Sequence, residues 1–308
     1  MIDVTLIGTA ALAPIPGRAL SCAFLTCGGH SVLFDCGEGT QSAARKAGVS
    51  LMKTDIIALT HYHGDHIFGL PGLLQTMFSA GRTEPIYITG PEGLFSVMSL
   101  MLGLTGNLPF DVRLFEIPAD GLRLCEMIPG WPYECVLSSF PVKHRCTAQG
   151  YSFVLNRAGK FDPSKAQELG VPVAMWKILQ KGESVNVEGK EILPSQVLGE
   201  KRKGIKVIFT GDTAMCESLT ESAKGADLMI CDSTYGNDSE AGKAIDRGHM
   251  TFSHAAECAK IAGVKKLWLT HYSQTVTDPA IFLPNAQRIF PETVCGYDGM
   301  SETLRFES

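Results

Sequence analysis

The sequence lacks segments that would direct a protein into or across a membrane. Its longest apolar stretches, such as residues 94–104, are shorter than the ~20 residues that a membrane-spanning helix needs. The first residues, MIDVTLIGTAALAP, show no basic region followed by an apolar run and a small-residue cleavage site. With 308 residues, 45% of them hydrophobic, the chain can bury a sizeable core. These features predict a cytoplasmic globular protein.

The sequence also lacks paired cysteines. No two of its ten cysteines form a CxxC pair, and they are scattered singly from Cys22 to Cys295. Several lie in apolar runs such as SCAFLTC and LMIC, where a reduced cysteine behaves as a small buried hydrophobe. This pattern argues against both a disulfide framework and a cysteine-rich zinc cluster. We predict that the cysteines are structural.

The chain as a whole has no excess of positive charge, but one segment does. The net charge of −5 argues against indiscriminate coating of nucleic acid. Residues 156–206, however, hold ten Lys or Arg and six Asp or Glu, a local charge of +4. Charge alone does not distinguish a phosphate-binding patch from an ordinary solvated surface.

Short apolar runs bounded by Gly and Pro predict the fold class. Such runs, rich in Val, Ile, Leu and Phe, read as strands at residues 3–8, 23–28, 31–37, 55–60, 85–90, 112–118, 134–142, 151–155, 206–212, 228–233 and 266–271. Helical segments are expected at residues 40–47, 69–79, 91–103, 216–224, 252–262 and 279–289. The first eight strands contain more hairpin-like successions, and helices alternate with strands more regularly later. The pattern predicts an α/β protein with mixed sheets covered by helices.

Residues 157–205 interrupt this pattern. The segment has one short helical piece, SKAQEL, together with Pro and Gly punctuation and only weak strand signals. It separates the strands YSFVL and KVIFTGD and reads as an insertion that projects from the core. Long excursions of this kind often carry function.

A short internal repeat marks two strand ends. LTHY occurs at residues 59–62 and again at 269–272, each time directly after a predicted strand. His61 and His271 are thereby expected at the carboxyl ends of strands, where ligand sites collect in α/β folds.

The stretch LTHYHGDH holds three of the eight histidines and predicts a metal site. His61 and His63, two residues apart on an extended segment, can converge on one ion because alternate side chains share a face. We expect the cluster to lie on a loop rather than a helix, with Asp65 and His66 beyond Gly64 serving a second ion. Three further candidates each follow an apolar strand: His144, Asp212 and His271. These seven ligands suit zinc or manganese, whereas the isolated His30 and His254 are expected to be ordinary structural residues.

These motifs resemble the metallo-β-lactamase superfamily and, within it, the ribonuclease Z family of tRNA 3′-end processing endonucleases. The residues that carry the resemblance lie along nearly the whole chain: FDCGEGTQ at 34–41, LTHYHGDHIFGLPGLL at 59–74, GDT at 211–213, HMTF at 249–252 and LTHYS at 269–273. HxHxDH alone specifies only the superfamily, and its combination with the other motifs is more specific. The resemblance implies a four-layer αββα sandwich, here a single domain of residues 1–308 with an inserted arm at about 157–205.

The resemblance also implies a site and a reaction. Two zinc ions per chain, with manganese as the alternative, would be held by His61, His63 and His144, by Asp65, His66 and His271, and by a bridging Asp212. A hydroxide between the metals would attack phosphorus and remove the 3′ trailer of a tRNA precursor, leaving a 3′-hydroxyl on the tRNA. Asp65 matches the proton acceptor of the family, and His249 matches a histidine that assists the leaving 3′ oxygen. Asp232 is a candidate to orient His249.

The resemblance further implies that the arm grips the tRNA elbow, often across a homodimer, with Trp176 available for stacking or packing. The chain departs from many members in two places. The arm lacks a Gly-Pro element, and HYSQTVTDP contains no arginine shortly after the last ligand histidine.

Three alternatives remain open from the sequence. A phosphodiesterase for cyclic or small organic phosphates would need the same metals without a tRNA arm. An acyl hydrolase on the same scaffold is disfavoured by Asp212 and DCGEGTQ. A non-catalytic RNA-binding protein is disfavoured because all seven ligands and His249 are present.

Overall fold

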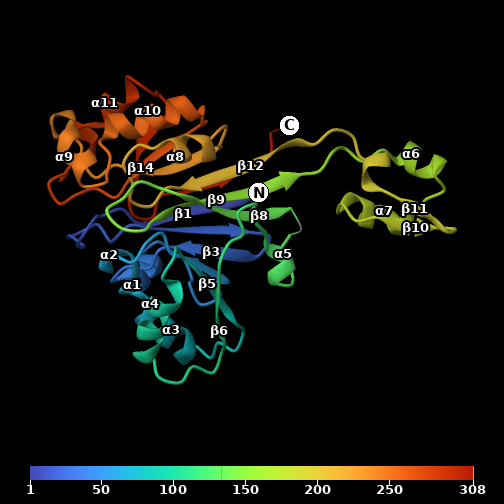
Figure 1. Cartoon of the computed structure of the whole chain (residues 1–308), viewed down its shortest axis with the longest axis horizontal. Coiled ribbons are helices and arrows are strands. Elements are labelled where there is room, and N and C mark those ends of the chain that lie inside the picture. The colour runs from blue at the N-terminus through green and yellow to red at the C-terminus, as the bar shows by residue number, and fades with distance from the viewer. Residues whose placement is uncertain (133, 308) are drawn as a thin grey trace.

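Two seven-stranded sheets stack against each other at the centre of the molecule (Figure 1). The structure is a computed structural model that describes residues 1–132 and 134–307. The first sheet has the order β16-β1-β2-β3-β4-β5-β6. Its strands are β1 (Ile2–Gly8), β2 (Cys22–Cys27), β3 (His30–Phe34), β4 (Ile56–Ala58), β5 (Ile86–Thr89), β6 (Val112–Phe115) and β16 (Ser301–Leu304).

The second sheet has the order β15-β14-β13-β12-β9-β8-β7. Its strands are β7 (Leu122–Arg123), β8 (Cys135–Pro141), β9 (Gln149–Arg157), β12 (Arg202–Phe209), β13 (Leu228–Asp232), β14 (Leu267–Thr270) and β15 (Thr293–Cys295). Both sheets change from antiparallel to parallel pairing along their order. β1 to β3 pair antiparallel and β3 to β6 parallel, while β7, β8, β9 and β12 pair antiparallel and β12 to β15 parallel.

Helices cover the outer face of each sheet, so the molecule has four layers (Figure 1). The helices against the first sheet are α1 (Thr40–Lys46), α2 (Gly64–Ile67), α3 (Leu70–Ser79) and α4 (Leu94–Gly103). Those against the second are α8 (Glu217–Ser222), α9 (Ala241–Asp246), α10 (Phe252–Ala262) and α11 (Leu283–Gln287), with the 3-10 turns η2 (Asp238–Glu240) and η3 (Pro279–Ile281). The short helix α5 (Leu124–Met127) lies beside β8.

Alternating side chains explain why the sheets are covered on both faces. In β1, Ile2, Val4 and Leu6 join the core between the sheets, whereas Ile7 joins the core under the helices of the first sheet. Successive side chains of a strand point to opposite faces, so a strand that is apolar on both sides needs a layer on each. The predicted αββα sandwich is confirmed.

The predicted strands and helices are present, with informative differences. All eleven predicted strands and all six predicted helical segments contain an element of the expected type, but β7, β10, β11, β15 and β16 were not predicted. As expected, hairpin-like neighbours are more frequent among the first eight predicted strands, where β1, β2 and β3 and the pair β8 and β9 are antiparallel. The later strands β12, β13 and β14 pair parallel and alternate with helices. Among the described residues, no helix is both long and apolar enough to cross a membrane.

Residues between β9 and β12 extend away from the sandwich on the right of Figure 1. This arm contains α6 (Pro163–Glu168), α7 (Val173–Gln180), the hairpin β10 (Val185–Val187) and β11 (Lys190–Ile192), and the turn η1 (Pro194–Gln196). It has a small core of its own, formed by Ala166, Val171, Leu179, Val185, Ile192 and Val197. Trp176 packs there, with its ring 5.3 Å from that of Phe161 and its indole N–H donating to the Val171 carbonyl at 3.0 Å.

Candidate metal centre

The seven candidate ligands converge at the carboxyl ends of strands from both sheets. His61 and His63 follow β4, Asp65 and His66 lie in α2, and the other three follow β8 (His144), β12 (Asp212) and β14 (His271). The expected placement of the whole HxHxDH cluster on a loop was wrong. His63 is the N-cap of α2, a four-residue helix whose first turn carries Asp65. Despite this change of backbone conformation, the His66 ring lies 4.1 Å from the His61 ring, so the two parts of the motif stay together.

One set of nitrogen atoms gathers around His63. Its Nδ1 lies 2.9 Å from His61 Nε2 and 3.4 Å from His144 Nε2. His144 is oriented by a 2.9 Å hydrogen bond between its Nδ1 and the carbonyl of Gly248. The three imidazoles therefore present nitrogen lone pairs to a common point.

A second set gathers around His66 and His271. His66 Nε2 is 3.6 Å from Asp65 Oδ2, and His271 Nε2 is 3.8 Å from the same oxygen. Asp212 stands between the two sets: its Oδ1 lies 3.4 Å from His66 Nε2 and 3.1 Å from His271 Nε2, while its Oδ2 lies 3.8 Å from His61 Nε2. Each carboxylate oxygen of Asp212 thus faces a different set.

Three polar atoms at the centre of this cluster face one another but have no hydrogen bond among the described residues. They are His66 Nε2, Asp212 Oδ1 and His271 Nε2, and all three are buried. Leaving such atoms unsatisfied costs about 1–3 kcal/mol each, and more for charged groups. Their convergence, together with imidazole and carboxylate chemistry, fits divalent cations as the missing partners.

Asp35 and Thr60 hold the histidines of the first motif. The buried Asp35 carboxylate accepts the Thr60 backbone N–H at 2.7 Å and pairs through Oδ2 with His66 Nδ1 at 2.7 Å. The Thr60 hydroxyl donates to Asp35 Oδ2 at 2.8 Å and lies 3.1 Å from His61 Nδ1. With their Nδ1 atoms engaged, His61 and His66 turn Nε2 toward the centre, as histidine ligands of metals usually do.

Asp232 and Thr234 repeat this arrangement on the second sheet. Asp232 Oδ2 pairs with His249 Nδ1 at 2.7 Å, and Oδ1 accepts the Thr234 hydroxyl at 2.7 Å. That hydroxyl oxygen also lies 2.9 Å from His271 Nδ1. Asp232 therefore contacts His249 as the sequence analysis suggested, and Thr234 was not predicted.

Backbone strain gathers around the site. Among the described residues, four other than glycine have a positive φ, and three of them belong here: Leu12 (66°), Asp35 (61°) and His271 (62°). Such conformations cost on the order of 1–3 kcal/mol and persist where the surroundings impose them. The backbone N–H of Leu12 donates to Asp65 Oδ2 at 2.8 Å, so this strained loop holds one of the candidate ligands.

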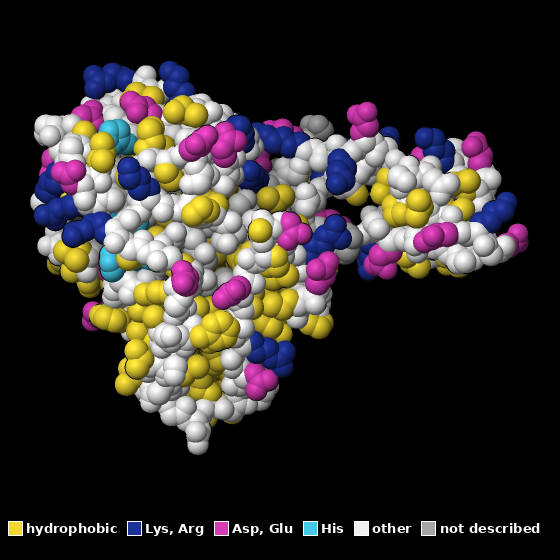
Figure 2. All heavy atoms as spheres, in the orientation of Figure 1, with side chains coloured by type: hydrophobic (Ala, Val, Ile, Leu, Met, Phe, Trp, Pro, Cys, Tyr) yellow, Lys and Arg dark blue, Asp and Glu magenta, His cyan; other side chains and the backbone are white. Residues whose placement is uncertain are grey.

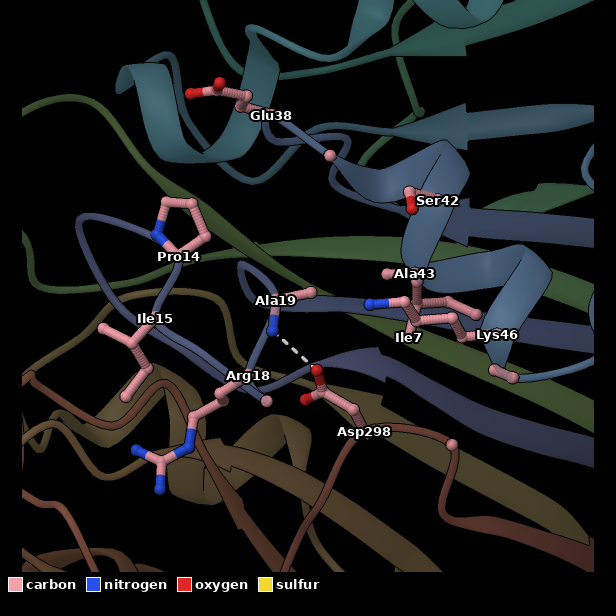
Figure 3. Close-up of a pocket in the computed structure, with 14 residues that line it drawn as sticks. Ile7, Pro14, Ile15, Arg18, Ala19, Glu38, Ser42, Ala43, Lys46 and Asp298 are labelled. Atoms are coloured by element: carbon pink, nitrogen blue, oxygen red, sulfur yellow. Dashed lines mark hydrogen bonds between the residues drawn. The ribbon is translucent and has the colours of Figure 1, made fainter.

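A cavity of about 430 Å³ lies behind that loop, between it and α1 (Figure 3). Pro14, Ile15, Arg18, Lys46 and Asp298 are among its lining residues, and it contains none of the seven candidate ligands. Asp298 holds the loop in place, accepting the backbone N–H of Ala19 at 2.6 Å. The cavity is thus a neighbour of the metal cluster rather than part of it.

The electrostatics of the site suit cations. Burial, followed by the nearby charge of His66, lowers the pKa of His61 to about 2, so its imidazole is neutral and free to ligate. Burial alone would raise the pKa of Asp65, but its contacts with His271 and His66 hold it below the usual range. Burial opposes ionisation of Asp212 as well, yet the charges of His271 and His66 keep its pKa low. Two ionised carboxylates therefore lie beside the Nε2 atoms of His66 and His271.

His249 has the opposite character. Burial would lower the pKa of His249, but the charge and hydrogen bond of Asp232 outweigh burial and raise it to about 9. The protonated imidazole therefore prevails at neutral pH. It stacks on His271 with ring centroids 5.4 Å apart, at the edge of the cluster.

The remaining histidines are structural, as predicted. His30 stacks on Trp131 at 5.0 Å and lies 3.3 Å from Asp55. His254 receives the Thr251 backbone N–H in the capping box of α10. All ten cysteines are free; nine are buried or half-buried, whereas Cys146 is exposed and lies beside His61, His63 and His144. Its spacing of two residues from His144, the same as between His61 and His63, was the available signal.

Comparison with known proteins agrees with this fold and cluster. A family model described as a β-lactamase superfamily domain matches residues 155–272, and one described as anti-Pycsar protein Apyc1 matches residues 2–97. The crystal structure of the short form of human tRNase Z superposes with a TM-score of 0.70 at 26% identity, covering 99% of this chain and 100% of that one. The sandwich and its ligand cluster define a member of the metallo-β-lactamase superfamily.

Curated relatives narrow the class. Ribonuclease Z of Lachnoclostridium phytofermentans is 41% identical over 307 residues, covering 100% of this chain and 99% of the relative. Ribonuclease Z of Lachnospira eligens is 41% identical over 309 residues with the same coverage. The chain belongs to the ribonuclease Z family.

Proposed function

We propose that this protein is the endoribonuclease that removes the 3′ trailer from tRNA precursors and leaves a 3′-hydroxyl on the tRNA. The observation that carries the proposal is the complete cluster around Asp212, with His249 beside it, in a chain that matches ribonuclease Z relatives from end to end. Unpaired buried polar groups destabilise a protein. A non-catalytic protein on this fold is therefore not expected to retain seven convergent ligands and the buried residues that orient them.

Two metal ions fit the proposal best. His61, His63 and His144 would hold one, while Asp65, His66 and His271 would hold the other. Asp212 would bridge them, since its two oxygens face different sets. Zinc is the ion we favour, with manganese as the alternative. Divalent cations held there would offset the negative charge that develops on the phosphoryl group.

The protein supplies the proton transfers. Asp65 is ionised and fixed by the Leu12 N–H, so it can accept the proton of the attacking water. His249 is protonated and held by Asp232, so it can donate a proton to the leaving 3′ oxygen of the ribose. Both groups adjoin His271: Asp65 Oδ2 lies 3.8 Å from His271 Nε2, and the His249 ring stacks on the His271 ring at 5.4 Å.

Basic side chains next to the cluster suit a polynucleotide. Lys143 and Arg145 flank His144 and are both exposed. Figure 2 shows further Lys and Arg side chains beside the histidines visible on this face of the core. Phosphate contacts of this kind contribute most of the affinity of proteins for nucleic acids.

The arm at about residues 157–205 is, in this proposal, a tRNA-binding insertion in a single domain of residues 1–308. Its separate small core makes it a rigid extension able to reach RNA far from the cut. On the face in Figure 2, its Lys and Arg alternate with Asp and Glu, so we expect scattered phosphate contacts rather than one basic stripe.

We further propose a cytoplasmic homodimer. Ten free cysteines are typical of a reducing compartment. The side chains of Phe78 on α3 and of Phe95, Leu100 and Leu104 on and after α4 are exposed, and Figure 2 shows hydrophobic side chains gathered in this region. Contiguous exposed apolar surface often marks a protein interface.

The test compares a precursor tRNA with a chromogenic small phosphodiester. We expect a single cut beside the discriminator base of the precursor and weaker turnover of the small ester. Turnover of the ester without a cut in the precursor would reject tRNA as the substrate and favour a small-molecule phosphodiesterase. Metal analysis of protein purified without chelators should find more than about one ion per chain, because a smaller content would contradict the two-ion ligand set.

A further inference from the structure

The candidate metal centre contains a soft ligand type that the seven assigned residues do not include. The Cys146 sulfur and one ring nitrogen each of His61, His63 and His144 all lie within 4.8 Å of one another. Cys146 is also the one exposed cysteine of the ten. It therefore stands at the mouth of the cluster, with its thiol turned toward the three imidazoles.

The spacing is close to that of a four-ligand zinc site. With Zn–S of about 2.3 Å and Zn–N of about 2.0 Å, tetrahedral ligand atoms lie roughly 3.3–3.6 Å apart. Separations of up to 4.8 Å would have to shorten by roughly 1.2–1.5 Å, whereas His61 Nε2 and His63 Nδ1, which are 2.9 Å apart, would separate slightly. Cys146 lies in the exposed bend of residues 145–147, two positions after His144, so a small movement of this bend suffices.

An independent observation shows that this centre is built for cations. His66 Nε2, Asp212 Oδ1 and His271 Nε2 are buried, unpartnered and aimed into the same cluster from the other side. They belong to α2 and to the ends of β12 and β14, and none lies on the bend that carries Cys146. We therefore infer a cation at this centre from atoms other than the Cys146 sulfur, which lies beside them.

The two halves of the centre differ in chemical softness. The half around His63 offers imidazoles and a thiol, whereas the half around His271 offers imidazoles and the oxygens of Asp65 and Asp212. Thiolates favour zinc strongly over manganese, while carboxylates accept either ion.

We propose that Cys146 is a thiolate ligand of the ion held by His61, His63 and His144 in the substrate-free protein, and that it makes this position selective for zinc. When the sulfur binds the ion, the thiol releases its proton to solvent, and no electron is transferred. The proposal rests on the metal assignment of the proposed function but concerns the identity of the ion rather than the RNA substrate.

Cobalt(II) substitution tests the proposal without RNA. The cobalt-loaded protein should show the near-ultraviolet charge-transfer band of a thiolate–cobalt bond, and Cys146→Ser should lose that band while keeping the visible bands of bound cobalt. Cys125→Ser is the matched control and should keep both, because Cys125 packs beside the core between the sheets. Identical near-ultraviolet spectra of the original protein and Cys146→Ser would overturn the proposal.

Competition and alkylation provide a second readout. Cys146→Ser should weaken zinc binding by about 10-fold or more, since even outer partners of ligands contribute about 10–100-fold. Its affinity for manganese should change little. Zinc should also slow iodoacetamide alkylation of Cys146, measured by peptide mass spectrometry, and leave that of Cys125 unchanged. Equal alkylation of Cys146 with and without zinc would contradict ligation by its sulfur. Cleavage of precursor tRNA tests the proposed function separately, because it does not depend on whether Cys146 binds the ion.

Discussion

Two buried aspartates, each paired with a threonine, hold four histidines of the site. Asp35 and Thr60 engage His66 and His61, and Asp232 and Thr234 engage His249 and His271. Asp35 lies at the carboxyl end of β3, which pairs with β4, the strand that His61 follows. Asp232 lies at the carboxyl end of β13, which pairs with β14, the strand that His271 follows. The two sheets thus contribute matching half-sites, which gives the LTHY repeat a structural meaning.

Replacing Asp232 by asparagine should change the pH dependence of cleavage. Asp232 raises the pKa of His249 to about 9, so the acid form is present below that pH and is lost as the pH rises through it. In Asp232→Asn the charge is gone, and the alkaline fall in kcat should move to lower pH. The profile is measured with a ribose leaving group. An aryl diester with a good leaving group is the control, because it needs little help from an acid. An alkaline limb that stays in place would contradict the role of His249 as proton donor.

Replacing Thr234 by valine should weaken metal binding. The hydroxyl orients His271 through Nδ1, and loss of such a partner costs about 10–100-fold in metal affinity or activity. Thr234→Ser keeps the hydroxyl and should restore most of the affinity. Zinc titration of the metal-free protein is the measurement, and equal affinities for the valine and serine variants would show that the hydroxyl has no positioning role.

The sequence predicted those elements whose signals are local. The eleven apolar runs became strands because each buries its own side chains, and the seven ligand types were visible at strand ends. The helix α2 was missed because four residues, GDHI, are too few to show a helical period. The hairpin of β10 and β11 was missed because the arm buries only six core residues. Asp35 and Thr234 could not be assigned from sequence, since their partners are 31 and 37 residues away.

Removing the arm should separate tRNA binding from chemistry. Its two ends meet, because the Gly199 backbone N–H donates to the Lys160 carbonyl at 2.9 Å, so a short glycine linker can replace residues 161–198. The other hydrophobic cores contain none of residues 161–198, so the shortened protein should fold. We expect a higher KM for precursor tRNA, a weaker salt dependence of binding and unchanged hydrolysis of a small diester. Equal loss of both activities would mean that the arm is structural.

The whole molecule should associate through the apolar surface of α3 and α4. Leu100→Glu and Leu104→Glu place charges where 76% and 70% of these side chains are exposed, so the monomer should remain folded. Sedimentation velocity should show a shift from dimer to monomer. Ile261→Glu on α10, 65% exposed in the chain, is the matched control and should leave the dimer intact. A dimer that survives both leucine substitutions would place the interface elsewhere.

The most direct test of the account is the chemical identity of the ends produced from a precursor tRNA. Zinc-loaded protein should cut once, on the 3′ side of the discriminator base, giving a 3′-hydroxyl on the tRNA and a 5′-phosphate on the trailer. His63→Ala should abolish the cut, because it removes the imidazole at the centre of one ligand set. Cleavage at scattered sites, a 3′-phosphate on the tRNA, or undiminished cleavage by His63→Ala would contradict a metal-dependent tRNA 3′ endonuclease.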